Sequence, residues 1–343
     1  MTELTTPTPT ITDRELAHVL AAFRTGPAHR VAFLPDGMMN RNWRVDTPDG
    51  VFALKQIIDV TPANARRSLN VLGALAAAQV PVCPPRPTRD GDVVAEIDGR
   101  AFCLLPWAHG EHRHGASLTP GQAAHLGAVL AHLHIHLAGA GLSEPERPTA
   151  KVTDPHAAAG EADRFLRVID ALPEPTGFDA DTRNLLMQRK DLIAAHAHHR
   201  PATTEPAGPV GWTHGDVQPL NLLWSDGAVT AILDWDRLAP RPLAEEVTRT
   251  GQVQFTTPDG RMDLPLVAAF TTGYRHVLPL DGDDLADAVT RLWWKRATDF
   301  WQLQWHYDKG DTGPDHLWLT GERLLHWWTR RRDEVTAAFT GHV

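Results

Sequence analysis

Cysteine is scarce in this sequence, since Cys83 and Cys103 are the only two in 343 residues. Two cysteines cannot form the disulfide framework of a small secreted domain, so a reducing cytoplasmic setting is the simplest expectation. No apolar run approaches the ~20 residues that a membrane-spanning helix needs. Residues 1–10 also lack the basic and apolar regions of a signal peptide. We therefore expect a cytoplasmic protein with no membrane partner.

An excess of positive charge is also missing. The 33 Lys and Arg are outnumbered by 42 Asp and Glu, which gives a formal net charge of −9. This balance disfavours a nucleic-acid partner and fits a neutral or cationic small molecule better. It gives no indication of the oligomeric state.

The hydrophobic pattern changes along the chain from strand-like to helical. A chain of 343 residues is long enough to bury two cores. We expect an α+β fold, with a small β-rich lobe over residues 1–105 and a larger, mainly helical lobe over residues 106–343, and a hairpin turn at Asp98-Gly99. Strands are expected at residues 31–34, 42–45, 51–55, 93–97 and 100–105, and helices at 14–25, 62–79, 121–137, 157–172, 181–199, 264–277, 285–307 and 315–339.

Polar residues suited to phosphoryl transfer interrupt two short apolar segments. The first reads Trp212-Thr-His-Gly-Asp-Val-Gln-Pro-Leu-Asn-Leu-Leu-Trp224, and the second reads Ile232-Leu-Asp-Trp-Asp236. One Asp can orient a hydroxyl group, while an Asn and a second Asp can ligate the magnesium that neutralises phosphate oxygens. The ordinary alternative is that these residues cap turns, where Asp and Asn are common.

Two features of the expected β-rich lobe could contact a nucleotide. Lys55 ends the apolar strand Val51–Lys55, from which an ammonium group can reach phosphates; a solvated lysine is the alternative. Gly37-Met-Met-Asn40 lies in a turn, where glycine allows backbone amides to approach phosphate closely. The turn has no G-x-G-x-x-G pattern, so a plain β-turn is an equal alternative.

Five segments together form a known pattern. They are His214-Gly-Asp-Val-Gln-Pro-Leu-Asn221 (H-G-D-x-x-x-x-N), Ile232-Leu-Asp-Trp235, Val51-Phe-Ala-Leu-Lys55, Val80-Pro-Val-Cys-Pro84 and Leu126-Gly-Ala-Val-Leu-Ala-His-Leu-His134. At these residues the sequence resembles the aminoglycoside phosphotransferase and choline kinase-like superfamily, which has the two-lobed protein-kinase fold. The resemblance runs from about residue 30 to at least residue 250. It is specific to the superfamily and not to a substrate.

This resemblance implies roles for the motif residues. Asp216 would be the catalytic base that orients the acceptor hydroxyl, and Asn221 and Asp234 would bind Mg²⁺. His214 is expected to be structural, with its imidazole bonded to the backbone of the loop that holds Asp216.

The resemblance also implies a site for ATP. Lys55 would contact the α- and β-phosphates, and backbone groups of Leu105 to Trp107 would bind the adenine. Gly37 to Asn40 would cover the phosphates.

One departure from the superfamily concerns the partner of Lys55. Kinase-like folds pair this lysine with a glutamate on the following helix, but no acidic residue occurs from Thr61 to Gln79. The position of the glutamate falls near Ser68. Glu96 is a possible substitute, and weaker nucleotide binding is the other possibility.

The sequence therefore predicts an ATP-dependent O-phosphotransferase that acts on a small hydroxylated molecule. By family analogy the acceptor is an amino sugar or an antibiotic, in resistance or self-protection. A metabolic kinase for choline, homoserine or a sugar is the first alternative, and a nucleotide-binding pseudokinase scaffold is the second. Trp294, Trp301 and Trp305 share a face of the expected helix 285–307, where they either pack in the core or form a stacking wall for the acceptor.

Overall fold

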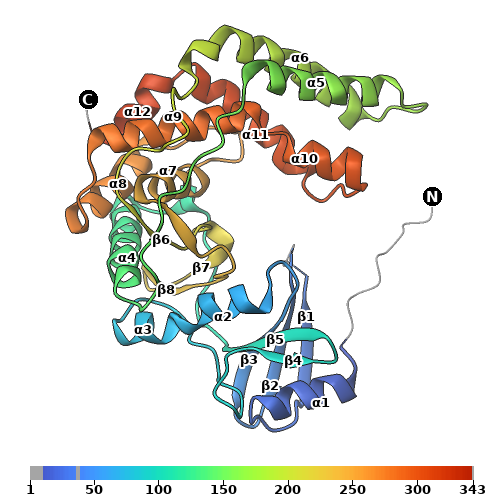
Figure 1. The fold of residues 1–343 in the computed structure, drawn as a ribbon, viewed down its shortest axis with the longest axis vertical. Coiled ribbons are helices and arrows are strands. Elements are labelled where there is room, and N and C mark those ends of the chain that lie inside the picture. The colour runs from blue at the N-terminus through green and yellow to red at the C-terminus, as the bar shows by residue number, and fades with distance from the viewer. Residues whose placement is uncertain (1–10, 36–38, 342–343) are drawn as a thin grey trace. The chain divides into compact units, whose positions relative to one another are not determined.

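The computed structural model describes residues 11–35 and 39–341 of the chain (Figure 1). It divides into two compact units that alternate along the sequence. The sheet unit comprises the described residues of Met1–Arg113, His132–Glu144 and Trp212–Ala239, and the helical unit comprises those of His114–Ala131, Pro145–Gly211 and Pro240–Val343. The lobe boundary expected between residues 105 and 106 stays a prediction.

A five-stranded antiparallel sheet forms the first part of the sheet unit, in the order β1-β2-β3-β5-β4. Helix α1 lies against this sheet (Figure 1). Alternate residues of β2, β3 and β5 build a core with α1. This core includes Phe23, Trp43 and Phe102. The bounds are α1 Asp13–Ala22, β1 Arg30–Leu34, β2 Arg41–Thr47, β3 Gly50–Ile57, β4 Ala95–Ile97 and β5 Arg100–Pro106.

Local signals in this region predicted the structure well. The expected strands and the first helix are present within a few residues, and β4 and β5 are joined at Asp98-Gly99. Both turn residues have positive φ, 49° and 74°, as a tight two-residue hairpin requires. The helix expected over residues 62–79 is divided at Val71 into α2 (Pro62–Asn70) and α3 (Leu72–Ala77).

Short strands that the pattern did not resolve surround the motif. Strands β7 and β8 form one antiparallel pair, and β6 and β9 form another. Their bounds are β6 Val210–Thr213, β7 Leu222–Ser225, β8 Ala228–Ile232 and β9 Ala239–Pro242.

The remaining described elements are helices, which confirms the α+β class. Helix α7 was not predicted, because its buried face carries mostly polar side chains. The bounds are α4 Pro120–Ala138, α5 Pro155–Asp170, α6 Gly177–His196, α7 Leu243–Gln254, α8 Leu264–Val277, α9 Gly282–Thr298, α10 Trp301–Leu303, a π-helix Gln304–Asp308, α11 Asp315–Thr329 and α12 Arg332–Thr340, with short 3-10 turns at Gly115–Ser117, Ala197–His199 and Pro219–Asn221.

The prediction of one continuous helix over residues 285–307 was wrong. Helix α9 ends at Thr298, and Asp299 is extended, with φ −106° and ψ 132°. The guanidinium of Arg189 donates hydrogen bonds to the carbonyl oxygens of Arg296, Ala297 and Asp299, at 2.8, 3.1 and 3.3 Å. These bonds compete with the backbone hydrogen bonds that would continue the helix.

The three tryptophans expected on that helix are therefore not on one face. Trp294 is buried in α9 and donates to the Thr153 carbonyl at 3.0 Å, so its role is packing. Trp301 and Trp305 lie beyond the break and are half-buried, with an edge-to-face contact at 6.0 Å.

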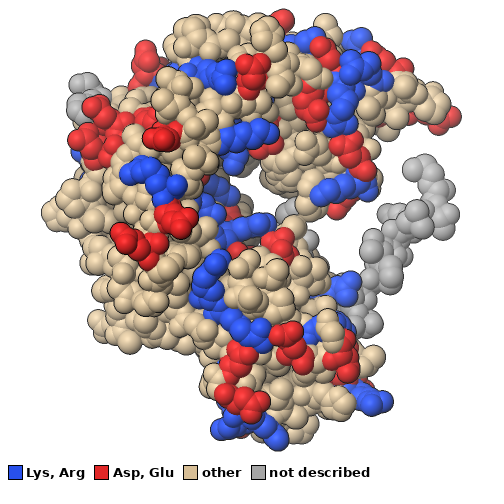
Figure 2. Space-filling view, viewed as in Figure 1, with Lys and Arg blue, Asp and Glu red and all other residues tan. Residues whose placement is uncertain are grey.

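The surface matches the mixed charge of the sequence. Figure 2 shows acidic and basic side chains interspersed over the five-stranded sheet and over α5 and α6. Among the described helices, none is both long and apolar enough to cross a bilayer.

Candidate active site

The β7–β8 hairpin brings together the two motif segments. Its turn is Asp226-Gly227, with φ values of 51° and 81°, the conformation of a tight hairpin. Leu222 pairs with Ile232, and the next residue, Leu233, donates its N–H to the Asn221 carbonyl at 2.8 Å. Asn221 and the segment that leads into Asp234 are thus neighbours despite their separation in sequence. The Asp-Gly dipeptide is typical of such a turn, although this hairpin was not predicted from the sequence.

His214 holds the loop, as predicted. Its side chain is fully buried, and its Nε2 donates to the Leu233 carbonyl at 2.9 Å. Its Nδ1 accepts the N–H of Asp216 at 3.2 Å. Gly215 lies between the two residues with φ 85°, a conformation that favours glycine. Both ring nitrogens serve the backbone, so His214 does not act as the base.

Asp216 is half-buried and oriented by two side-chain amides. Gln218 Nε2 donates to its carboxylate at 3.1 Å. Asn221 Nδ2 donates to its carbonyl at 2.8 Å and to its carboxylate at 3.2 Å. A carboxylate fixed in this way can accept a hydrogen bond from an acceptor hydroxyl and take up its proton.

Lys55 lies on the face of the sheet opposite α1. It pairs in register with Cys103, and Ala53 pairs with Leu105, so these four side chains share one face. Burial raises the pKa of the Cys103 thiol to about 12, so Cys103 is neutral at physiological pH. The predicted lysine and the first of the predicted adenine-binding residues therefore point to the same side.

The ammonium group of Lys55 contacts two carboxylates. Its Nζ lies 2.7 Å from Asp234 Oδ1 and 2.7 Å from Asp236 Oδ2. Burial alone would lower the pKa of Lys55, but the two carboxylates outweigh burial and raise it. Burial likewise favours a higher pKa for Asp234, but the charge of Lys55 holds it below its ordinary value.

Glu96 was the wrong partner for Lys55. The Glu96 carboxylate pairs with Arg66 at 2.8 Å, and Ser68, at the position of the helix glutamate, is a buried hydroxyl. Asp236, which also contacts Lys55, was assigned no role from the sequence.

The phosphate-covering turn is described only at its end. Gly37 lies outside the described residues, and its predicted contact with phosphate stays a prediction. Asn40 is buried, and its Nδ2 donates to Asp236 at 2.7 Å. Its Oδ1 accepts the N–H groups of Ile58 and Asp59 at 2.8 and 3.2 Å. The Asn40 side chain therefore anchors Asp236 to the end of β3.

The strand β5 narrows the choice of adenine-binding groups. The N–H of Trp107 already donates to the Val51 carbonyl at 3.0 Å, and Pro106 has no N–H. Because carbonyls alternate in direction along a strand, that of Pro106 points away from β3. The predicted binding of adenine by backbone groups of Leu105 to Trp107 thus depends mainly on the Pro106 carbonyl.

The residue types at the predicted metal site suit magnesium. Asn221 and Asp234 would hold the ion through an amide oxygen and a carboxylate, which are the hard ligands that Mg²⁺ takes. Bound there, the ion would neutralise charge on the transferred phosphoryl group. No group of three or more His, Cys, Asp or Glu suited to a metal occurs within residues 11–35 and 39–341.

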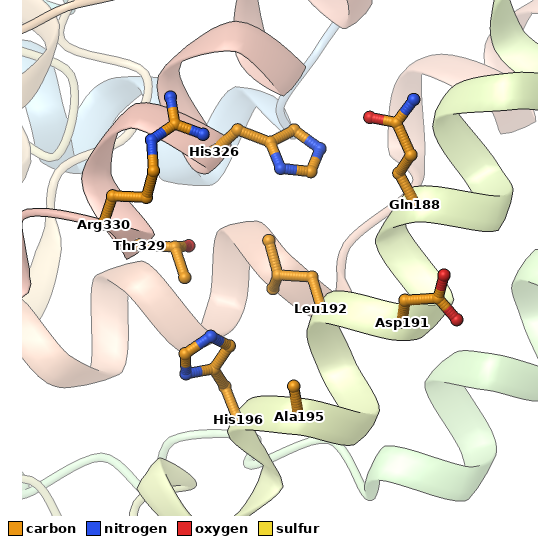
Figure 3. Close-up of a pocket in the computed structure, with 8 residues that line it drawn as sticks. All are labelled: Gln188, Asp191, Leu192, Ala195, His196, His326, Thr329 and Arg330. Atoms are coloured by element: carbon orange, nitrogen blue, oxygen red, sulfur yellow. The ribbon is translucent and has the colours of Figure 1, made fainter.

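A pocket in the helical unit lies apart from these residues. It is an open pocket of about 390 Å³ between α6 and α11, lined by side chains that include Gln188, Asp191, His196, His326 and Arg330 (Figure 3). None of the predicted site residues lines it. The motif residues that contact one another, among them Lys55, Asp216, Asn221 and Asp234, all belong to the sheet unit.

Comparison with protein families decides the assignment. The model of the phosphotransferase enzyme family, APH, matches residues 30–280. The chain belongs to this family. The superfamily resemblance predicted from the motifs is thereby confirmed.

Individual relatives are distant but match more than three quarters of the chain. Homoserine kinase of Neisseria meningitidis serogroup B is 24% identical over 298 residues, which is 84% of this chain and 90% of the relative. Homoserine kinases of other bacteria also match. The chain is a small-molecule kinase with a hydroxyl acceptor.

Solved structures confirm the two-lobed protein-kinase-like fold. Spectinomycin phosphotransferase in complex with ADP and spectinomycin has a TM-score of 0.66 at 13% identity, covering 97% of this chain and 100% of that one. An amicoumacin kinase in complex with AMP-PNP and Ca²⁺ has a TM-score of 0.63 at 17% identity, covering 94% of each chain.

Proposed function

We propose that this kinase transfers the γ-phosphoryl group of ATP to a hydroxyl group of a small molecule that also carries an amine. The observation that carries the proposal is the arrangement around Asp216. Asn221 binds both the carbonyl and the carboxylate of Asp216, and its own carbonyl binds the residue before Asp234. A base and two metal ligands are thereby joined within one hydrogen-bonded loop, as in-line phosphoryl transfer requires.

The nucleotide donor is proposed to be ATP with Mg²⁺. In the segment Leu105 to Trp107, the backbone group that points away from β3 is the Pro106 carbonyl, which can only accept a hydrogen bond. The adenine amino group can donate to it, whereas the guanine oxygen at the same position is itself an acceptor. ADP and AMP-PNP in the two solved kinases are consistent with this choice.

Two acceptor classes are supported by different observations. The motif resemblance and the solved antibiotic kinases favour an amino sugar or an antibiotic, with a role in resistance or self-protection. The curated relatives favour homoserine or a similar amino alcohol. Both classes present a hydroxyl beside an amine, so the reaction at Asp216 is the same.

The pseudokinase alternative loses its main support. It depended on an unpaired Lys55, but Lys55 has two carboxylate partners.

A panel assay tests the proposal. Purified protein with ATP and Mg²⁺ should consume ATP when supplied with one of homoserine, spectinomycin, an amino sugar or choline, and mass spectrometry should find one added phosphate on the product. An uncharged sugar serves as the comparison. Nucleotide binding without turnover on any of these acceptors would reject the proposal.

A further inference from the structure

The single positive charge of Lys55 is paired with two negative charges. One ammonium group lies between the carboxylates of Asp234 and Asp236, each at 2.7 Å, so the three residues carry one net negative charge. A lone Lys–Asp pair would be neutral, and a metal ion that bound the Asp would compete with the lysine for the single negative charge. With two carboxylates, one can leave while Lys55 stays paired.

The two carboxylates differ in how they are held. The side chain of Asp234 is 46% exposed, and its backbone is left-handed, with φ 60°. The side chain of Asp236 is 11% exposed. Exposure suits Asp234 to a ligand that arrives from solvent, whereas Asp236 is positioned for a permanent contact.

Asp236 is also attached to the strand that carries Lys55. Asn40 donates to Asp236 Oδ2 at 2.7 Å, and Asn40 is itself bound by the N–H groups of Ile58 and Asp59, directly after β3. Arg237, the next residue along, pairs with Asp59 at 2.9 Å. Asp236 and Lys55 are thus fixed to the same end of β3 through separate contacts.

We propose that Asp236 is the residue that positions Lys55, in the place of the missing helix glutamate, and that it thereby frees Asp234 to bind the metal. The proposal rests on the proposed function. Asp236 holds the ammonium group toward the nucleotide phosphates in the presence or absence of a metal ion. Asp234 shares Lys55 with Asp236 in the absence of a metal ion, and it would serve as a metal ligand when the ion is bound.

Matched variants test this division of roles. Asp236→Asn and Asp234→Asn remove the same charge two residues apart and keep the side-chain shape. Binding of ADP is measured by calorimetry in EDTA and again with Mg²⁺. In EDTA, Asp236→Asn should weaken binding about tenfold, equivalent to ~1.4 kcal/mol. Asp234→Asn should keep or improve binding in EDTA and should lose the gain that Mg²⁺ gives to the wild type.

A double-mutant cycle with Lys55→Ala separates positioning from a general structural effect. If Asp236 acts through Lys55, Asp236→Asn should cost no further ADP affinity once Lys55 is removed. A loss that persists in the Lys55→Ala background contradicts the proposal. So does a loss that appears only with Mg²⁺, which would make Asp236 a metal ligand.

Two controls keep the outcomes distinct. If Asp236→Asn does not fold, Asn40→Ala is measured instead, because it releases Asp236 while leaving its charge; unchanged ADP binding in EDTA would then contradict the proposal. Failure of the wild type to bind ADP under either condition would reject the proposed function and this inference with it. Normal wild-type binding with no effect of Asp236→Asn would reject this inference alone.

Discussion

Asn221 contacts Asp216 twice, through the carbonyl at 2.8 Å and through the carboxylate at 3.2 Å, with one amide nitrogen. The Nδ2 atom of the Asn221 side chain therefore faces Asp216. In this orientation the Oδ1 atom would be the one to bind a metal ion. One buried residue therefore links the proposed base to the proposed metal site.

Replacement of Asp216 tests the assignment of the base. Asp216→Asn keeps the size of the side chain but cannot accept a proton, so kcat should fall by at least ~100-fold. The affinity for ATP should change little, because the nucleotide contacts proposed here lie on other residues. Steady-state kinetics and calorimetry on the same preparation measure both. An unchanged kcat would exclude Asp216 as the base.

Replacement of Asp234 tests the metal assignment. Asp234→Ala should weaken Mg²⁺-dependent nucleotide binding by about tenfold or more, as expected for the loss of a charged metal ligand. Asp234→Asn is the better-folded comparison, because Asn tolerates the left-handed backbone at this position. Titration of Mg²⁺ at fixed ADP follows the effect. Equal Mg²⁺ dependence in wild type and variants would remove Asp234 from the metal site.

Features set by neighbouring residues were predictable from the sequence. The Asp98-Gly99 hairpin and the strands on either side of it depend on turn chemistry and alternation within a few residues. The motif residues Asp216 and Asn221 lie five positions apart, so their proximity also followed from the sequence.

Features set by distant residues were not predictable. Asp236 pairs with Lys55 across 181 positions, and no residue near Lys55 in the sequence indicates this partner. The end of α9 depends on Arg189, more than 100 residues earlier, because its guanidinium takes carbonyls that a continuous helix would use. Helical periodicity continues through that point, so the pattern alone favoured a longer helix.

Asp179 should make stability depend on pH. It is buried at the start of α6 and accepts hydrogen bonds from Tyr307 at 2.7 Å and from the Thr176 backbone at 2.7 Å. Burial favours a higher pKa for Asp179, but these hydrogen bonds outweigh burial and lower its pKa below the ordinary 3.8. Because the pKa of Asp179 is lower in the folded state than in the unfolded state, the ionised carboxylate stabilises the folded protein at pH values above the unfolded-state pKa. This stabilisation is lost as the pH falls through the folded-state pKa.

Asp179→Asn should therefore cost about 1–2 kcal/mol of unfolding free energy at pH 7 and less at pH 3. Urea denaturation at the two pH values measures the difference. The exposed Asp181→Asn, in the same helix, is the matched control and should show little change. A cost for Asp179→Asn that is the same at both pH values would refute the linkage.

Glu322 should be the most sensitive charge in the helical unit. Its carboxylate pairs with Arg189, and the two side chains are 0% and 4% exposed. Glu322→Gln removes the carboxylate that pairs directly with the buried Arg189 charge, so it should destabilise the protein by about 3–5 kcal/mol. The double replacement Arg189→Met with Glu322→Leu removes both charges and should recover part of this loss.

An exposed ion pair serves as the control. Asp170→Asn breaks an exposed pair with Arg183 and should cost less than about 1 kcal/mol. Chemical denaturation compares the variants, and equal costs for the buried and exposed replacements would show that Glu322 does not neutralise Arg189.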